Sequence, residues 1–556
     1  MFSPTDTIVA LATAPARAGI GVVRISGPGA HGVARAILTV PHDLEPRRAT
    51  LTHVCGTALR RLESLIPNPQ SLIPNPQSRV SSPESRAPSI DEVVVTFFPA
   101  PHSYTAEDVV EISAHGSVAL LGEIVRAAIA AGARLAEPGE FTLRAFLNGR
   151  LDLVQAEAVA DLVDAVTPLQ ARVAFDQLDG TLTRAIGELD EQLFDLAARL
   201  EASVDFPEEG YHFVARGEAG EALARVRDGI DALLATSAAG RLIREGRHIA
   251  ILGKPNVGKS SLFNQLVGTD RAIVAAGPGT TRDMLRETID LDGLRLGLVD
   301  TAGIRVSDDE VEQEGVVRAR KAAEAADLVM VVLDRSRALE DIDIALVRET
   351  APAPRVVVVN KIDLPAAWDA SDAGVRDSGL GARETAGEPA EGSPDGPSNQ
   401  ADYRRVGDVE AGSSDPAGSA QTSPESRAPN PETGVVHLSL ETREGLDELC
   451  AAMRAALDVA EPLRDTVMVT NVRHETLLRQ ARESLARGIE NIEQGTSATN
   501  APEQGPGPIS RTGDSASEEL VLADIAEARR AFEEMTGKRT SEDVLRRIFE
   551  RFCIGK

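Results

Sequence analysis

The sequence predicts a multidomain protein in which mixed α/β domains are combined with an α-helical domain. Its 556 residues exceed what one hydrophobic core usually holds, so roughly two to four domains are expected. Residues 248–457 alternate apolar strand segments with helical segments, which is the pattern of a parallel sheet with crossover helices. Residues 151–240 and 518–556 repeat apolar residues at helical spacing, which predicts amphipathic helices.

The remaining parts of the chain are an N-terminal block, a C-terminal helix and three polar stretches. Residues 1–140 are predicted to mix strands and helices, because GIGVVRIS and DEVVVTFF are rich in β-forming residues. Near the C-terminus, Thr540 and Asp543 fit a helix capping box. Stretches rich in Gly, Pro and Ser lack an apolar period, so we expect disordered insertions there. They cover about residues 64–89, 370–433 and 495–517.

The composition restricts the partners and the compartment. The chain has 58 Lys and Arg residues against 86 Asp and Glu residues, a net charge of −28. An acidic surface disfavours non-specific binding to nucleic acid or anionic membranes, so a nucleic-acid partner needs a local basic patch or a second protein. The three cysteines form neither a disulfide framework nor a zinc pattern. We find no signal peptide and no membrane-spanning apolar run, and we expect a cytoplasmic protein without membrane contact.

A phosphate-binding loop is the most specific local motif. The segment HIAILGKPNVGKSS places an apolar strand before G-x-x-x-x-G-K-S, residues 253–260, and a helical segment follows. The glycines let backbone N–H groups surround the phosphates, Lys259 supplies positive charge, and the Ser260 hydroxyl can bind Mg²⁺. The plain alternative is a glycine-rich turn before a helix. The complete motif in its strand-loop-helix context argues against that alternative.

Two later segments select GTP over ATP. The segment DTAG follows the strand segment LRLGLV; Asp300 can lie just outside the direct metal ligands, and Gly303 can contact the γ-phosphate. The segment NKID, residues 360–363, follows RVVVVN. The carboxylate of Asp363 can accept two hydrogen bonds from the guanine N1–H and exocyclic amine, which adenine cannot donate.

The remaining parts of the nucleotide pattern are a switch threonine and a short loop. Thr280 and Thr281, in GPGTTRD, lie between the other motifs where a switch threonine completes the Mg²⁺ ligands. Ser439, in LSLETREGL, lies in the short loop expected after the next strand. Each segment alone is compatible with an ordinary turn, but their common order predicts a GTPase domain.

One expected catalytic feature is absent. Signalling GTPases carry a Gln directly after the D-x-x-G segment to orient the attacking water, and this chain has Ile304 there. Asn256, inside the phosphate-binding loop, could ligate a monovalent cation that supplies positive charge next to the phosphates. Glu312, in SDDEVEQEG, could orient water. For any single residue of that acidic run, a solvated loop remains the alternative.

These segments resemble the MnmE (TrmE) family of bacterial tRNA-modification GTPases. The resemblance includes DTIVALATAPARAGIGVVRISG, SYTAEDVVEISAHG, PGEFTLRAFLNGRLDLVQAEAVADLVDA and the final CIGK. It implies an N-terminal folate-binding and dimerisation domain, residues 1–145, and a discontinuous helical domain, residues 146–245 and 459–556. A Ras-like P-loop GTPase domain with a parallel sheet, residues 246–458, is implied to be inserted into the helical domain.

The resemblance also implies an activity. Members of this family are K⁺-dependent GTPases that act as homodimers with an FAD-containing partner, MnmG. The two proteins add an aminomethyl or carboxymethylaminomethyl group to carbon 5 of the wobble uridine of certain tRNAs. The one-carbon unit comes from a reduced folate such as 5,10-methylenetetrahydrofolate.

Carried onto this sequence, the resemblance assigns four kinds of site. Folate would be bound by Arg24, Glu111, Arg150 and Lys556. K⁺ would be bound by Asn256, Ala275, Gly277 and Thr280, Mg²⁺ by Ser260 and Thr281, and Glu312 would orient the attacking water. The residues expected to bind GTP are Asn256, Val257, Gly258, Lys259, Ser260, Ser261, Ala275, Ala276, Gly277, Pro278, Gly279, Thr280, Thr281, Asp300, Thr301, Ala302, Gly303, Asn360, Lys361, Asp363 and Ser439.

The tail and the overall function each leave an alternative open. Cys553 lacks partner ligands for a metal and fits a buried helical position poorly, and a nucleophilic or redox role stays open. The resemblance places the whole CIGK terminus at the edge of the folate site. The alternative function is a ribosome-assembly GTPase switch that docks on RNA. Such proteins usually carry a basic RNA-binding module or a second GTPase domain, whereas this acidic chain has one P-loop.

Overall fold

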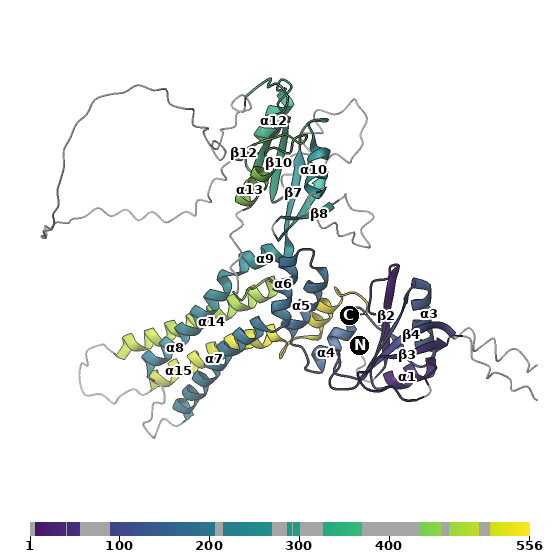
Figure 1. The fold of residues 1–556 in the computed structure, drawn as a ribbon. Helices are drawn as coiled ribbons and strands as arrows, with labels where there is room; N and C mark the ends of the chain where they lie inside the picture. The colour runs from purple at the N-terminus through teal and green to yellow at the C-terminus, as the bar shows by residue number, and fades with distance from the viewer. Residues whose placement is uncertain are drawn as a thin grey trace, which may run out of the picture. The chain divides into compact units, whose positions relative to one another are not determined.

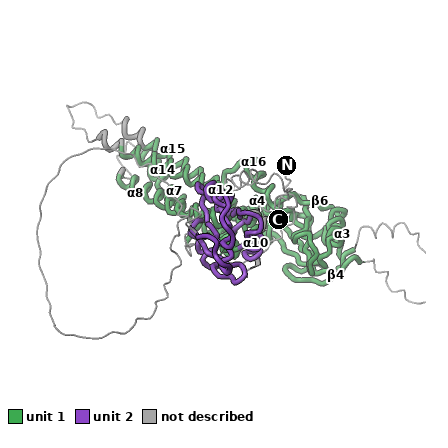
Figure 2. Tube along the Cα trace, turned by 90° about the horizontal axis from the view of Figure 1, so that it is seen from above, with its two compact units in different colours: residues 1–246, 290–295, 460–556 green, residues 247–289, 296–459 purple. Residues whose placement is uncertain are grey.

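A computed structural model describes residues 6–40, 42–55, 89–205, 215–268, 286–291, 293–300, 326–369, 434–457, 466–499 and 512–555. The chain divides into two compact units, which Figure 2 colours separately. Unit 1 consists of residues 1–246, 290–295 and 460–556, and unit 2 of residues 247–289 and 296–459. The expected insertion at 370–433 lies outside the described residues, and so does the expected insertion at 64–89 except for Ser89, which begins β4. We describe each unit separately.

The N-terminal part of unit 1 is a six-stranded sheet with the order β3-β4-β5-β2-β1-β6. All its strand pairs are antiparallel except β1 with β6. Buried residues of β2 and β5, among them Val23, Ile25 and Ile112, form a core with helices α1 and α3 (Figure 1). The strands are β1 (Ile8–Leu11), β2 (Ala18–Ser26), β3 (Thr50–Cys55), β4 (Ser89–Phe98), β5 (Val109–Gly116) and β6 (Arg134–Leu135); the helices are α1 (Ala30–Ile37), α3 (Val118–Ala130) and α4 (Glu140–Leu147). This mixture of strands and helices agrees with the prediction for the N-terminal block.

A buried charge network holds α4 against this sheet. The guanidinium of Arg144 is 3% exposed and donates to Asp6 Oδ1 at 2.6 Å and to Glu140 Oε1 at 3.0 Å. It also contacts Glu107 Oε2 at 3.2 Å. Glu107 accepts a hydrogen bond from Ser26 Oγ at 2.8 Å, which joins the loop before β5 to the end of β2. Because each buried charge has a partner, the network fixes the loop that carries Tyr104.

The rest of unit 1 is helical, and its long helices share one core. Buried residues that include Leu193, Leu223, Leu478 and Ile525 join α7, α8, α14 and α15. Amphipathic stripes of this kind bury one face of each helix against its neighbours. The helices are α5 (Leu153–Asp164), α6 (Pro168–Leu178), α7 (Thr181–Asp205), α8 (Arg216–Ala235), α9 (Ser237–Glu245), α14 (Val472–Thr499), α15 (Thr512–Thr536) and α16 (Glu542–Phe549).

Two local predictions for this helical part are wrong. The insertion expected at residues 495–517 is partly helical, because α14 continues to Thr499 and α15 begins at Thr512. A formed helix gains one backbone hydrogen bond for each residue added, so it can extend into a polar segment. The capping box at Thr540 is also absent. Ser541 caps α16 by accepting from Val544 N, while Thr540 Oγ1 donates to Glu534 O at 3.3 Å.

A buried ionic cluster joins α5 to the start of α14. Glu157 accepts from Arg473 Nη2 at 2.8 Å and from His474 Nε2 at 2.7 Å. Burial acts to raise the pKa of Glu157, but His474 and Arg473 outweigh burial and lower this pKa to about 2. Burial lowers the pKa of His474, so the imidazole is neutral near pH 7. The charge of Arg473 is therefore balanced chiefly by Glu157.

Unit 2 is a six-stranded sheet with the order β12-β11-β10-β7-β9-β8, in which the pairs from β12 to β9 are parallel. Every residue of β10 is buried, as expected for a strand covered on both faces. The carboxyl ends of β7, β10 and β11 lie next to one another, the usual edge for ligands in such sheets. The elements are β7 (Arg247–Leu252), α10 (Lys259–Gly268), β8 (Arg286–Leu291), β9 (Leu294–Asp300), β10 (Leu328–Asp334), α12 (Asp341–Glu349), β11 (Arg355–Asn360), β12 (Gly434–Leu438) and α13 (Leu446–Ala456).

The Glu157 cluster gives a testable stability prediction. Glu157→Gln leaves the charge of Arg473 without its main partner, so local opening of α14 should become easier by about 3 kcal/mol. Because the folded-state pKa lies below the ordinary 4.5, the contribution of Glu157 is complete above pH 4.5 and is lost as the pH falls toward 2. Amide hydrogen exchange in α14 measures this effect, and the variant and wild type should converge only as the pH reaches about 2.

The matched control is Glu218→Gln. Glu218 pairs with Arg199 at 2.7 Å, but both side chains are about half exposed, so its loss should change exchange by less than about 1 kcal/mol. Equal exchange protection of α14 in wild type and Glu157→Gln at pH 7 would contradict the prediction.

Candidate functional site

The phosphate-binding loop connects β7 to α10 at the carboxyl edge of the unit 2 sheet. Gly258 has a φ of +109°, and a Cβ there would lie 2.3 Å from Asn360 Nδ2. Only glycine combines this backbone conformation with such a close approach. Asn256 also has a positive φ, +66°, which asparagine tolerates better than most residues. The loop is therefore a tight turn whose shape depends on these two positions.

Two lysines of the loop have different partners. Lys259 Nζ donates to the carbonyls of Gly253 at 2.8 Å and Lys254 at 2.6 Å, so its ammonium lies over the loop. Lys254 Nζ contacts Asp343 of α12 at 2.6 Å and Glu340 at 3.1 Å. Burial acts to lower the pKa of Lys254, but these two carboxylates outweigh burial and raise it. Lys254 thus ties the loop to α12, while the ammonium of Lys259 bonds to carbonyls of the loop itself.

The segment predicted to recognise guanine is bonded to this loop. Asn360, the last residue of β11, donates from Nδ2 to Val257 O at 2.8 Å. Lys361 has a φ of +66° and donates from Nζ to Asn256 O at 3.2 Å. Residues that are about 100 positions apart in the chain are thereby held together, as a nucleotide that spans both segments requires. Asn360 is 2% exposed, so this link lies in the protein interior.

Asp334 is a further member of this site that the sequence did not single out. It ends β10, and its Oδ2 accepts from Lys361 Nζ at 2.6 Å. Burial acts to raise the pKa of Asp334, but hydrogen bonds from Lys361 and Ser336 outweigh burial and lower it. Trp368 Nε1 donates to the Asp334 carbonyl at 2.9 Å. The feature of the sequence that could have identified Asp334 is its position directly after the apolar strand segment LVMVVL.

The carboxylate predicted to read guanine is positioned by the next loop. Ser439 Oγ donates to Asp363 Oδ1 at 2.7 Å, and Ile362 N donates to Leu438 O at 3.3 Å. Ser439 is fully buried at the end of β12. Its hydroxyl therefore fixes one carboxylate oxygen of Asp363.

The other predicted nucleotide residues are placed only in part. Ser260 and Ser261 are exposed at the start of α10. Asp300 ends β9 and pairs in register with Ile251 of β7, which brings its backbone beside the phosphate-binding loop. The predicted switch and K⁺ residues lie outside the described residues; they are Ala275, Ala276, Gly277, Pro278, Gly279, Thr280, Thr281, Thr301, Ala302, Gly303 and Glu312.

Three of the four residues expected to bind folate gather in the N-terminal part of unit 1. Arg24 of β2 and Glu111 of β5 are cross-strand neighbours, and Arg24 Nη2 lies 2.8 Å from Glu111 Oε1. The Arg24 guanidinium lies over the Tyr104 ring, 4.8 Å from its centroid, and Arg150 lies 6.0 Å from the same centroid. Arg150 Nη1 also donates to Ser103 O. Charged groups and the aromatic face of Tyr104 therefore converge at this place.

Tyr104 is the residue that sequence reasoning missed here. Its hydroxyl lies 2.8 Å from Thr142 Oγ1, which joins the Tyr104 loop to α4. The chain has only three tyrosines, and one of them in the loop before a β-strand was an available signal. An aromatic ring next to two arginines and a carboxylate suits a flat, polar ring system.

The C-terminal tail runs against the loop before α4. Cys553 O accepts from Gly139 N at 3.4 Å, and Ile554 forms an antiparallel bridge with Pro138. Gly555 has a φ of +103°, and a Cβ there would lie 1.7 Å from Leu11 O, so no other residue fits. The Cys553 side chain is exposed. Lys556, the fourth folate residue, lies outside the described residues.

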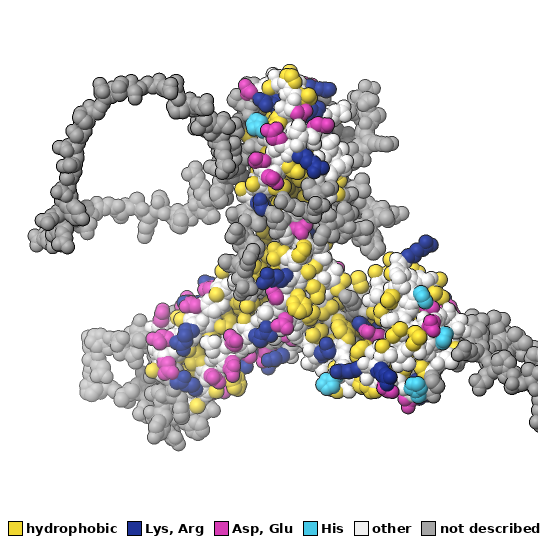
Figure 3. All heavy atoms as spheres, viewed as in Figure 1, with side chains coloured by type: hydrophobic (Ala, Val, Ile, Leu, Met, Phe, Trp, Pro, Cys, Tyr) yellow, Lys and Arg dark blue, Asp and Glu magenta, His cyan; other side chains and the backbone are white. Residues whose placement is uncertain are grey.

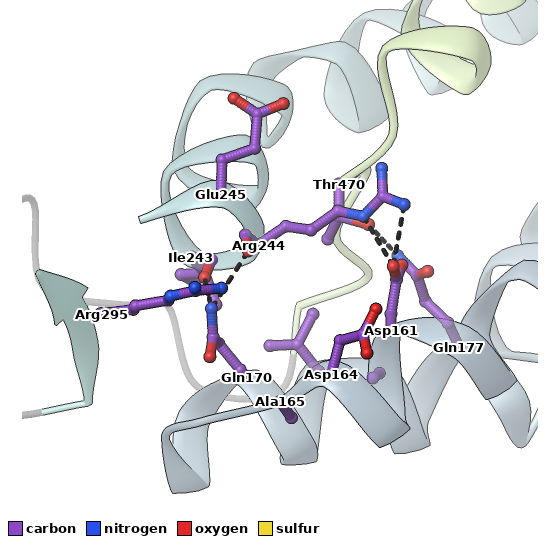
Figure 4. Close-up of a pocket in the computed structure, with 12 residues that line it drawn as sticks. Asp161, Asp164, Ala165, Gln170, Gln177, Ile243, Arg244, Glu245, Arg295 and Thr470 are labelled. Atoms are coloured by element: carbon purple, nitrogen blue, oxygen red, sulfur yellow. Dashed lines mark hydrogen bonds and ion pairs between the residues drawn. The ribbon is translucent and has the colours of Figure 1, made fainter. Parts of the chain in front are cut away.

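A pocket of about 210 Å³ between α5, α6 and α9 contains none of the predicted residues (Figure 4). Arg244 donates to Asp161 Oδ1 at 2.9 Å, and Gln170 Nε2 donates to the carbonyls of Ile243 and Arg244. Burial raises the pKa of Asp161 despite this arginine. Several polar groups of the pocket thus bond to one another, which joins α9 to α5 and α6.

In the described part of the chain, no group of three His, Cys, Asp or Glu side chains could hold a metal ion. No described helix is long and apolar enough to cross a membrane.

Comparison with known proteins identifies the family. Residues 7–150 match the family described as the GTP-binding protein TrmE N-terminus, and residues 153–553 match the MnmE helical domain. A tRNA modification GTPase MnmE of Koribacter versatilis is 37% identical over 99% of both chains. Proteins of the same name from Syntrophotalea carbinolica and Moorella thermoacetica are 38% and 37% identical over the same share. With both domain matches and full-length identity above 30%, this chain belongs to the MnmE family of tRNA modification GTPases.

Proposed function

We propose that this chain hydrolyses GTP in a K⁺-dependent way and that hydrolysis serves the modification of the wobble uridine of certain tRNAs. The observation that carries the proposal is the bonded arrangement of the two nucleotide segments. Asn360 and Lys361 hold the loop at Val257 and Asn256, and Ser439 orients Asp363. That arrangement lies in a chain whose full-length relatives are named tRNA modification GTPases.

The nucleotide would lie along the carboxyl edge of the unit 2 sheet. Backbone N–H groups of the loop and the ammonium of Lys259 would bind its phosphates, and Asp363 would accept from the guanine N1–H and amine. Lys361, fixed by Asp334, would cover the base from one side. The hydroxyls of Ser260 and Thr281 suit Mg²⁺, a hard cation that prefers oxygen ligands and that would neutralise the phosphate charge.

Potassium would add positive charge next to the phosphates, beside that of Lys259. The side chain of Asn256 is exposed on the loop and bonds to no other described residue, while its backbone carbonyl already accepts from Lys361. Its amide oxygen is therefore available as a K⁺ ligand together with Ala275, Gly277 and Thr280. With Ile304 in place of a glutamine, Glu312 is proposed to orient the attacking water.

The N-terminal site is proposed to bind a reduced folate such as 5,10-methylenetetrahydrofolate. The described side chains fit this group, because Glu111 can accept hydrogen bonds from a pterin ring, and Arg24 and Arg150 can donate to a ring carbonyl or to a carboxylate tail. Tyr104 offers an aromatic face beside them. The folate would supply the one-carbon unit, while Lys556 and Cys553 would close the site from the tail.

The remaining parts of the proposal concern organisation and partners. We propose that the protein is a cytoplasmic homodimer that acts with the FAD-containing MnmG. We also propose that an N-terminal domain spans residues 1–145 and that a GTPase domain, residues 246–458, is inserted between the helical segments 146–245 and 459–556. No contact among the described residues favours the alternative role, a ribosome-assembly GTPase switch, over the proposed role in tRNA modification.

Replacement of K⁺ by Na⁺ tests the proposed hydrolysis. Na⁺ is a smaller ion than K⁺ and would fit the proposed K⁺ site less well, so the GTPase rate should fall by on the order of tenfold or more, as when a transition-state charge partner is removed. Asn256→Ala should abolish the difference between the two ions and retain GTP binding. A wild-type rate that is the same in both salts would count against the proposed mechanism.

Asp363→Asn tests base recognition. The variant loses two hydrogen bonds to a charged acceptor, so the affinity for GTP should fall about 100-fold or more. Xanthosine triphosphate, which has a carbonyl in place of the guanine amine, should instead bind better to the variant than to wild type. Competition with a fluorescent nucleotide measures both affinities, and Asp447→Asn, an exposed residue of α13, is the control. Unchanged GTP binding by Asp363→Asn would refute the assignment.

Removal of residues 553–556 tests the role of the tail. Because Gly555 fits against Leu11 and the tail borders the N-terminal domain, reduced-folate binding and tRNA modification should be lost. K⁺-stimulated GTP hydrolysis should continue, since the phosphate-binding loop and Asp363 belong to unit 2 and the tail belongs to unit 1. Cys553→Ser separates a need for the thiol from a need for the backbone. Normal tRNA modification by the truncated chain would rule out this placement.

A further inference from the structure

A second cavity of unit 1, of about 260 Å³, is lined by four arginines. It lies between α5, the start of α14 and the C-terminal helix α16. The arginines are Arg244, Arg473, Arg547 and Arg551, and Glu157 is the one acidic side chain among the lining residues. Such a concentration of positive charge is unusual in a chain with a net charge of −28. On the face drawn in Figure 3, acidic and basic side chains are interspersed over the helical part.

The two inner arginines are fixed and neutralised by the protein. Arg473 is bonded to Glu157 through two nitrogens, at 3.1 and 2.8 Å, and to the carbonyls of Glu534 and Met535, both at 3.1 Å. Arg244 is paired with Asp161 at 2.8 Å (Figure 4). These pairs build a rigid polar wall whose net charge is close to zero.

The two outer arginines remain uncompensated. Arg547 and Arg551 are four residues apart, so they lie on the same side of the C-terminal segment and both line the cavity. Both side chains are exposed, and neither forms a hydrogen bond or ion pair with another described residue. Two planar guanidinium groups that are free to donate and face one cavity match the geometry of a phosphate.

The remaining wall of the cavity is apolar. Val544, Ile548 and Phe552 also recur every four residues and line the cavity beside the two arginines. A charged group flanked by an apolar surface is the chemistry of a nucleotide unit, in which a phosphate is attached to a sugar and a base. A bare anion would use only the arginines.

We propose that this cavity binds the phosphate backbone of the RNA substrate, with Arg547 and Arg551 as the donors to phosphate oxygens. The proposal rests on the function proposed above, since it takes tRNA as the substrate. It supplies the local basic site that an acidic chain needs to hold a polyanion. Phe552 lines the cavity and directly precedes Cys553, whose carbonyl contacts Gly139, so RNA bound here would lie next to the C-terminal tail.

The double variant Arg547→Gln/Arg551→Gln tests this inference in the full-length protein. Its binding to an in vitro transcribed tRNA with a wobble uridine is measured by fluorescence anisotropy between 50 and 200 mM KCl. Affinity should fall at least tenfold at the lower salt concentration. The slope of log K against log salt should become shallower by about 1.5 to 2, because about two phosphate contacts are lost.

The control is Arg530→Gln/Arg546→Gln, which removes the same charge from two exposed arginines that do not line the cavity. It should bind the RNA within about twofold of wild type and keep its GTPase rate in K⁺. Thermal unfolding and circular dichroism verify that both double variants fold.

Two outcomes would overturn the inference. They are RNA binding by the cavity variant that equals that of the control, and no RNA binding by the wild-type chain. Each is distinguishable from failure of the proposed function, because K⁺-dependent hydrolysis and tRNA modification by the wild type do not depend on where RNA binds.

Discussion

The buried hydrogen bond from Asn360 Nδ2 to Val257 O is the contact on which the nucleotide site depends. It joins the end of β11 to the loop that follows β7; in the sheet, β10 lies between these two strands. Because the parallel register aligns their carboxyl ends, the phosphate-binding loop and the guanine segment meet at one edge. A buried amide that lost this partner would carry a desolvation cost of about 1–3 kcal/mol, so the bond also fixes the loop in one conformation. Lys361 extends the same connection from Asn256 to Asp334 at the end of β10.

Unit 1 contains charged groups that are buried inside a protein with few aromatic residues. Arg144 and Arg473 are each held by buried carboxylates, and both clusters join helices to neighbouring segments. A buried ion pair contributes little net stability, yet breaking it is costly, so these clusters specify geometry. The Arg144 cluster supports the loop of Tyr104. The Arg473 cluster forms the inner wall of the cavity that is lined by four arginines. The arrangement of the proposed folate and RNA sites thus depends on charges that bind no ligand themselves.

Much of this architecture could be predicted from local patterns. The strand before GKPNVGKS and the strand RVVVVN have the expected places in a parallel sheet, and the N-terminal segments GIGVVRIS and DEVVVTFF are strands. Predictions from short sequence patterns were wrong at the ends of helices. Ser541 replaced Thr540 as the helix cap, and α14 and α15 extend into a stretch expected to be disordered. Asp334 and Tyr104 were missed because their roles come from contacts between distant segments, which no local period encodes.

The central claim is that GTP hydrolysis by this chain serves the modification of tRNA. The most direct measurement is nucleoside analysis, by mass spectrometry, of tRNA from cells that lack the gene and from the same cells complemented with wild type or with Lys259→Ala. The account predicts that uridines modified at carbon 5 disappear from the wobble position, return with wild type and do not return with the variant. An unchanged wobble-uridine content in the cells that lack the gene would contradict it.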